Sequence, residues 1–302
     1  MKNPTRLVIY SCLFVLLIPT FREAVAAPIT FNTALPVARD EKLVRIQTKL
    51  LLSIDDPSSA DRDLTVRAVP MVAVYGVTEK LALFGILPVL DKEIKITTDA
   101  GRLTRGDSGI GDFTAMARYT AWKKDAPGKT IRLAPFVAFK MPTGEDRATD
   151  SFGILPQPLQ LGSGAWDYSL GMVLTRQTLD RQIDASISYT LKTEANEFEF
   201  GDEARIDASY QHRVWPRELS SGVPGFMYAV LESNLIWQGN NRSRGIADNN
   251  TGGVTWFLAP GIQYVTKRTV LELAVQVPVV QDLNGQSLKN DFISSLSFRM
   301  NF

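Results

Sequence analysis

The chain has 302 residues, of which 33 are Lys or Arg and 32 are Asp or Glu, so its formal net charge is +1. This balance argues against the basic surface that a nucleic acid would require, and we expect no nucleic-acid partner. Hydrophobic residues make up 45% of the sequence, yet the mean hydropathy is −0.03. That combination is typical of apolar and polar residues that alternate along strands rather than cluster.

The first 26 residues have the layout of a secretory signal peptide. Lys2 and Arg6 are basic, residues 7–18 are mostly apolar, and residues 24–26 form an A-x-A cleavage site. The apolar run is too short for a helix that spans a bilayer, which needs about 20 such residues. We therefore predict a signal peptide over residues 1–26 and a mature chain that starts at Ala27.

Removal of this peptide changes the chemistry that is open to the chain. The single cysteine, Cys12, lies within it, so the mature chain has no disulfide, no thiolate metal site and no cysteine nucleophile. The peptide also carries three of the 33 basic residues and one of the 32 acidic residues. The mature chain then has 30 basic and 31 acidic residues, a net charge of −1.

Residues 27–41 show no strand pattern and are predicted to form a short periplasmic arm. Residues 42–302 divide into segments of about ten residues with period-2 alternation, which predicts an all-β, transmembrane, antiparallel up-and-down β-barrel of about twelve strands. An even number of strands is what a single-chain bacterial barrel needs if both ends of the chain lie in the periplasm. The predicted strands span residues 42–53, 64–75, 79–90, 110–121, 130–141, 165–177, 181–192, 203–214, 225–238, 252–264, 269–280 and 290–302.

The connections between these segments alternate in length. Those at 76–78, 179–180 and 265–268 are short, whereas those at 91–109 and 142–164 are long and polar. Short periplasmic turns and long outer loops are typical of outer-membrane barrels. Aromatic residues gather near both predicted strand ends, which favours two membrane interfaces over a soluble sandwich with the same alternation. We therefore expect the chain to lie in the bacterial outer membrane, in contact with its lipid.

The last eleven residues alternate strongly and end on an aromatic side chain. Leu296, Phe298 and Phe302 share one face, and Ser297 and Arg299 share the other. This strand resembles the terminal strand of Gram-negative outer-membrane barrels, in which a C-terminal Phe is an assembly signal. The resemblance implies that Phe302 is recognised by the barrel-assembly machinery.

Charged residues on the predicted water-facing set are candidates for the lining of the lumen. Both signs are present, so these charges could pair across the lumen and hold the wall in register, or form a polar constriction that selects solutes. The two interpretations are compatible. The candidates are Arg45, Lys49, Arg67, Asp112, Arg118, Arg132, Asp167, Asp184, Lys192, Arg205, Asp207, Glu232, Glu272 and Arg299.

The predicted outer loop 142–164 contains Leu155, Leu159 and Leu161, which water would solvate poorly. Two interpretations are open for it. The loop could be a rigid, Pro-rich cap that packs on the rim of the barrel, or a plug or apolar vestibule for a hydrophobic substrate.

The sequence contains few of the features that an enzyme active site requires. The only histidine, His212, lies at the predicted periplasmic end of a strand without a Ser or Asp neighbourhood, so we interpret it as an interface residue. One histidine and no mature cysteine disfavour a soft-ligand metal site. No Gly-rich loop joins a strand to a helix as a nucleotide site would require. We expect no catalytic residues, no metal and no cofactor.

Four short motifs carry a family resemblance. They are Gly109-Ile-Gly-Asp112, Pro142-Thr-Gly144, residues 164–168 (GAWDY) and Gly201-Asp202. Their order and spacing resemble the outer-membrane channel-like family associated with the meta-pathway of phenol degradation, over most of residues 40–302. The resemblance implies a channel or transporter for the uptake of small, aromatic or hydrophobic compounds. The alternative is a surface barrel whose outer loops contact a partner without transport.

Overall fold

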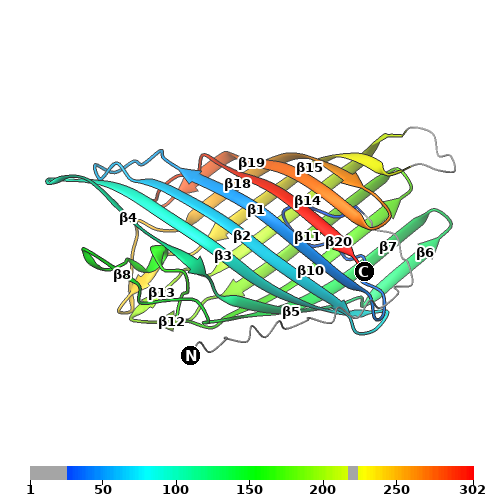
Figure 1. The fold of residues 1–302 in the computed structure, drawn as a ribbon, viewed down its shortest axis with the longest axis horizontal. Coiled ribbons are helices and arrows are strands. Elements are labelled where there is room, and N and C mark those ends of the chain that lie inside the picture. Colours follow the sequence, from blue (N-terminus) through cyan, green and yellow to red (C-terminus); the bar gives the residue numbers. More distant parts are fainter. Residues whose placement is uncertain (1–25, 217–223) are drawn as a thin grey trace, which may run out of the picture.

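The computed structural model describes residues 26–216 and 224–302, so the predicted signal peptide, apart from Ala26, lies outside the described residues. Twelve antiparallel strands form a closed barrel. The pairing of β10 with β7 and of β1 with β20 closes it, and Figure 1 shows the red C-terminal strand beside the blue first strand. The barrel strands are β1 (Lys42–Ser53), β2 (Asp63–Gly76), β3 (Leu81–Thr98), β5 (Phe113–Tyr119), β7 (Lys129–Met141), β10 (Asp167–Thr178), β11 (Arg181–Leu191), β14 (Glu203–Trp215), β15 (Phe226–Gln238), β18 (Gly253–Val265), β19 (Thr269–Leu283) and β20 (Phe292–Asn301).

The predicted strand count and architecture are confirmed. Each predicted segment corresponds to one barrel strand, most of them within two or three residues of the observed bounds. The short turns, such as the one between β10 and β11, lie at the end of the barrel where β1 begins, and the long loops lie at the opposite end. In the part of the chain that the structure describes, no helix is long and apolar enough to cross a membrane.

The period-2 pattern sets which side chains face out. In β11, Ile183 and Ile187 are exposed on the exterior, whereas the intervening Asp184 is fully buried inside. In β20, Leu296 and Phe298 face out and Arg299 faces in. The exterior is therefore apolar and the interior polar, which is the distribution that lipid outside and a polar lumen inside require.

Two of the predicted connections are wrong. The predicted loop 91–109 is instead an extension of β3 that turns back into β4 (Gly101–Ile110), which pairs with β3 beyond the barrel. The link between the predicted strands 110–121 and 130–141 contains β6 (Trp122–Ala126), which forms a hairpin with β7. Figure 1 shows both hairpins projecting at opposite ends of the barrel.

The outer loops contain short elements of their own. Four of them, two from each of two loops, join in a small separate sheet in the order β12-β13-β16-β17. The remaining elements are β8 (Thr149–Asp150), β9 (Gly153–Ile154), the 3-10 helix η1 (Gln157–Leu159), β12 (Glu194–Ala195), β13 (Phe198–Glu199), β16 (Arg242–Ser243) and β17 (Ile246–Ala247).

Residues 27–41 were predicted to form a short periplasmic arm, and in the structure most of them lie inside the barrel. Together with Ala26 they form the N-terminal segment (residues 26–41), most of which folds into the lumen before the chain enters β1. Ile29, Ala34 and Leu35 are buried against inward-facing strand residues. The reason is physical, because this segment covers its apolar side chains while it satisfies buried polar groups of the wall.

The side chain of Phe302 faces the exterior, and its backbone nitrogen donates a hydrogen bond of 2.8 Å to the carbonyl oxygen of Lys42. Phe302→Ala retains this backbone bond and loses only the exposed ring. We predict that the variant lowers the yield of folded protein in the outer membrane while leaving the assembled barrel unchanged. Heat-modifiable gel mobility checks this, with Phe298→Ala, an equally exposed ring on the same strand, as the control. Normal yield for Phe302→Ala would contradict the assembly role.

Candidate functional site

The structure places all but one of the predicted lumen residues on the inner side of the wall or at its outer mouth. The members that face the lumen along the strands are Arg45, Lys49, Arg118, Arg132, Asp184, Arg205, Asp207, Glu232, Glu272 and Arg299, and those at the outer mouth are Asp112, Asp167 and Lys192.

Arg67 is the exception, because it faces the exterior of the barrel. It lies on the same face of β2 as the exposed residues Met71 and Tyr75, and its guanidinium is 2.8 Å from the carboxylate of Asp91 on β3. Both side chains are about half exposed. The sequence reasoning placed Arg67 in the water-facing set, whereas an external ion pair accommodates it on the outer face.

Some of the lumen charges pair, as one interpretation of the sequence expected. Arg45 is 2.7 Å from Glu272, whose carboxylate is fully buried and also accepts a hydrogen bond from Ser297. Arg205 is 3.2 Å from Asp207 on the same strand. For Lys49, no hydrogen bond or ion pair is found among the described residues. The Arg45–Glu272 pair links β1 to β19 across β20, and removing one partner of such a buried pair is costly.

Glu232, which is completely buried, pairs with no cation in the part of the chain that is described. Its carboxylate instead accepts hydrogen bonds from the backbone nitrogens of Ile29, at 2.7 Å, and Thr30, at 2.9 Å, and from the Thr30 hydroxyl. The carbonyl oxygen of Ile29 accepts a bond of 2.8 Å from Arg45. Glu232 therefore anchors the first half of the N-terminal segment to the wall.

A second anchor lies further along the segment, at Asp184. The Thr33 hydroxyl donates a hydrogen bond of 2.9 Å to Asp184, whose carboxylate also accepts one from Thr175. The backbone nitrogen of Ala34 donates to the Thr175 hydroxyl at 2.7 Å. From β5, Arg118 donates to the carbonyl oxygens of Thr33 and Leu35. The segment thus lies in the lumen and is held by polar contacts with several strands.

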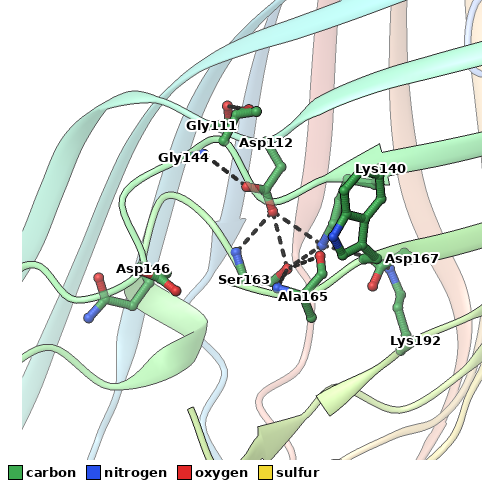
Figure 2. A network of polar contacts seen from close by, with 12 residues as sticks. Gly111, Asp112, Lys140, Gly144, Asp146, Ser163, Ala165, Asp167 and Lys192 are labelled. Carbon is green, nitrogen blue, oxygen red and sulfur yellow. Dashed lines mark hydrogen bonds and ion pairs between the residues drawn. The ribbon is translucent and has the colours of Figure 1, made fainter. Parts of the chain in front are cut away.

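At the outer mouth, Asp112 and Asp167 share one lysine. Lys140 on β7 is 3.2 Å from Asp112 and 2.7 Å from Asp167, and Lys192 is 3.0 Å from Asp167. Asp112 also accepts hydrogen bonds from the backbone nitrogens of Gly144, at 3.0 Å, and Ser163, at 2.9 Å. Figure 2 shows this chain of alternating charges, called here the mouth cluster (Asp112, Lys140, Asp167 and Lys192). Both ends of loop 142–164 are fixed to it.

Three of the four sequence motifs meet at the mouth cluster, which gives them a common structural role. A Cβ atom on Gly162 would lie 2.5 Å from the carbonyl oxygen of Gly144 and 2.8 Å from Asp112. One on Gly144 would lie 3.0 Å from the carbonyl carbon of Gly111. The chain segments cross so closely that only glycine fits. The fourth motif has the same role elsewhere, since a Cβ on Gly201 would collide with the carbonyl oxygen of Gly239.

Gly162→Ala tests this crossing. We predict that the added methyl group displaces loop 142–164 and lowers the free energy of unfolding by about 1–2 kcal/mol, as overpacking commonly does. Limited proteolysis within the loop and urea unfolding in detergent measure both effects. Gly239→Ala is the control, because a Cβ there meets nothing closer than 3.5 Å. Equal protease resistance of the two variants would refute the close crossing.

Loop 142–164 packs as a cap rather than extending into water. Leu155, Leu159 and Leu161 are all buried, and the Gln160 side chain donates to the carbonyl oxygen of Leu155 at 2.8 Å. Lys92 on the inner side of β3 donates to the carbonyl oxygen of Pro158 at 3.1 Å. Of the two interpretations, the structure agrees with the rigid cap, which covers the inner side of the wall at β3, β5 and β7.

The remaining candidate, His212, lies on β14 between Arg181 of β11 and Ala229 of β15. Its ring stacks on that of Tyr210 with centroids 6.4 Å apart. Tyr210 is exposed on the exterior, so His212 lies on the outward face, as an interface residue would. Sequence reasoning missed Lys140, Thr175 and the threonines of the N-terminal segment. Lys140 lies on the same face of β7 as Arg132, which is the lumen face, so the period-2 pattern could have identified it.

Comparison with known proteins agrees with this architecture. Residues 65–289 match the family described as "Putative MetA-pathway of phenol degradation". The structure is similar to that of the COG4313 outer membrane channel from Pseudomonas putida F1, with 16% identity, a TM-score of 0.67, and coverage of 95% of this chain and 100% of that chain. The beta domain of the Bordetella autotransporter BrkA shares 10% identity and a TM-score of 0.44, over 87% of this chain and 99% of that chain. No curated protein matches the chain.

Proposed function

The chain belongs to the family of the phenol-degradation MetA pathway and forms an outer-membrane β-barrel, and from that premise we propose that it is a channel for the uptake of small aromatic or hydrophobic compounds. A signal peptide over residues 1–26 would direct its export, and the barrel-assembly machinery would insert it. The neighbour in P. putida is described as an outer membrane channel, which supports the same role for this chain.

The observation that carries the proposal is the content of the lumen. The barrel interior is not filled by large side chains of the wall alone, because a separate piece of chain, the N-terminal segment, occupies its centre. The contacts of that segment with Glu232, Asp184 and Arg118 are largely hydrogen bonds, which water can replace when the segment moves. A barrel with a purely structural role would have little need for a lumen that is occupied by a segment whose contacts water can replace.

The lumen also has an apolar side, which favours a solute with an apolar body. Val74, Phe84 and Met116 face inward on neighbouring strands and pack with Val37 of the N-terminal segment. The family description, which refers to phenol degradation, supports an aromatic substrate class. These residues would contact the ring of the solute as it passes the segment.

Solute flux into proteoliposomes tests the function. Refolded protein is reconstituted, and the entry of phenol is compared with that of a sugar of similar size, against protein-free liposomes. We expect protein-dependent entry that favours the aromatic solute. Equal entry of both would indicate a general pore. No entry of either, from a barrel with normal heat-modifiable mobility, would favour the alternative of a barrel whose outer loops contact a partner without transport.

A further inference from the structure

We propose that the lumen contains a binding site for a small aromatic carboxylate, in a cavity between the N-terminal segment and the β1–β3 side of the wall. This inference rests on the proposed channel function, and it narrows the substrate class to aromatic compounds that carry an anionic group.

The cavity has a volume of about 300 Å³ and lies near the end of the barrel where β1 begins. That volume is at the lower end of the range found for small-molecule sites, so it suits a molecule with a single ring. The N-terminal segment forms one wall through Leu35, Val37 and Ala38, and the strands form the others. A solute that passes the segment on its way through the barrel would meet this cavity.

Charge is unevenly distributed around the cavity. Its lining includes four guanidinium groups and two carboxylates, so the lining residues carry a net charge of +2. One of the carboxylates, Glu41, accepts hydrogen bonds from the backbone nitrogen of Ala38, at 2.9 Å, and from the Asn301 side chain, at 3.3 Å. The other, Glu79, lies exposed in the turn between β2 and β3. The four cations of the lining are Arg45, Arg118, Arg132 and Arg299.

Arg118 is the central cation of the site. Its side chain is buried, with 4% of the residue exposed, and its two hydrogen bonds go to the neutral carbonyl oxygens of Thr33 and Leu35. Among the described residues, no carboxylate lies within ion-pair distance of it. Asp184 acts on it only from further away, and the oxygens of Asp184 are already occupied by Thr33, Thr175 and Gln182. A buried cation in this state attracts an anion.

Arg132 provides a second cation that is weakly engaged. Its guanidinium donates to the Thr130 hydroxyl at 3.1 Å and reaches the exposed carboxylate of Asp125 only at 3.4 Å. No contact with the N-terminal segment is found for it within the described residues. Arg132 is therefore free to turn toward a bound carboxylate without loosening the segment, and its planar fork matches a carboxylate geometrically.

The apolar side of the cavity suits an aromatic ring. Leu35, Leu43, Val72 and Val74 line it, and the guanidinium of Arg118 lies over the ring of Phe84 at 4.9 Å from its centroid. A carboxylate near Arg118 would therefore place an attached ring among these side chains. A fully hydrophilic anion would leave this side unfilled, whereas a neutral aromatic molecule would leave Arg118 with only the neutral carbonyl oxygens of Thr33 and Leu35 as partners.

Binding and flux are measured separately, with benzoate as the probe and benzyl alcohol as its neutral counterpart. In isothermal titration of the folded protein in detergent, we expect benzoate to bind at least about tenfold more tightly than benzyl alcohol, as one charge-assisted hydrogen bond would provide. Arg132→Gln should remove most of this preference, and the double variant Arg118→Gln, Arg132→Gln all of it. Arg67→Gln, the same charge change on the exterior, is the control and should retain it.

The outcomes distinguish this proposal from the channel function. Equal binding of the two probes, or a preference that survives in the double variant, would overturn the carboxylate site. Phenol flux without preferential benzoate binding would leave the channel intact and overturn only the site. Preferential benzoate binding without any flux would support the site and overturn the channel.

Discussion

Deletion of residues 29–36 is expected to raise the single-channel conductance of the reconstituted barrel severalfold. These residues fill the centre of the lumen and bind Glu232 and Asp184. Without them, water enters the freed volume and hydrates the two carboxylates, because the wall around them is polar. The barrel itself should fold normally, since its strand pairing does not involve the segment. Planar-bilayer recordings measure the conductance, and heat-modifiable mobility verifies the fold.

A covalent lock provides the matched control. The hydroxyl oxygens of Thr33 on the segment and Thr175 on β10 are 3.0 Å apart, so two cysteines at these positions are close enough for a disulfide. The predicted mature chain contains no other cysteine. The double variant Thr33→Cys, Thr175→Cys should show low conductance when oxidised and should recover the behaviour of the unmodified protein after reduction. A deletion variant that conducts no better than the oxidised lock would show that the segment does not block the path.

Alternation accounts for how far the sequence alone predicts this fold. A barrel wall separates lipid from a polar lumen along every strand, so each strand carries the period-2 signal, and in Ile183, Asp184 and Ile187 the burial follows the pattern residue by residue. The same signal fails where both faces of a strand meet water. Residues 91–109 are mostly polar and were predicted as a loop, although backbone pairing between β3 and β4 makes them a hairpin.

The candidate site was predicted in part, because alternation places a side chain on a face but says nothing about its partner. Glu232 and Asp184 were assigned correctly to the lumen, yet their partners are backbone and hydroxyl groups of the N-terminal segment rather than cations across the lumen. Residues 26–41 have no periodic pattern, so local sequence could not indicate that they enter the barrel. The hydrogen bonds that these two buried carboxylates accept from the segment became visible only in the structure.

The mouth cluster joins residues that are remote in sequence, and only the closed barrel brings them together. Asp112 follows β4, Lys140 ends β7, Asp167 starts β10 and Lys192 follows β11. Each motif was recognisable alone as a strand entry or exit. Their shared role as the clamp of loop 142–164 depends on the pairing of β5, β7 and β10, which no local pattern specifies.

Asp167→Ala is expected to lower the free energy of unfolding by about 3 kcal/mol, near the lower limit for breaking a buried ion pair by removing one partner. The side chain of Asp167 is 4% exposed and binds both Lys140 and Lys192. Its loss leaves Lys192 without a carboxylate within ion-pair distance in the described part of the chain, and leaves Lys140 with Asp112 alone. The lysines remain about a quarter exposed, so water limits the cost and keeps it near that lower limit.

Urea unfolding in detergent measures this loss, and proteolysis of loop 142–164 shows where it acts. Asp99→Ala is the matched control, because it removes the same charge from an exposed turn at the tip of the β3–β4 hairpin and should change stability by less than about 0.5 kcal/mol. If Asp167 helps to hold the cap, Asp167→Ala should also expose loop 142–164 to protease. The reason is that Lys140, without Asp167, orients Asp112 and Ser163 less firmly. Loss of stability with a fully protected loop would mean that Asp167 supports the wall alone, and that the cap is held by Asp112 and the glycine crossing.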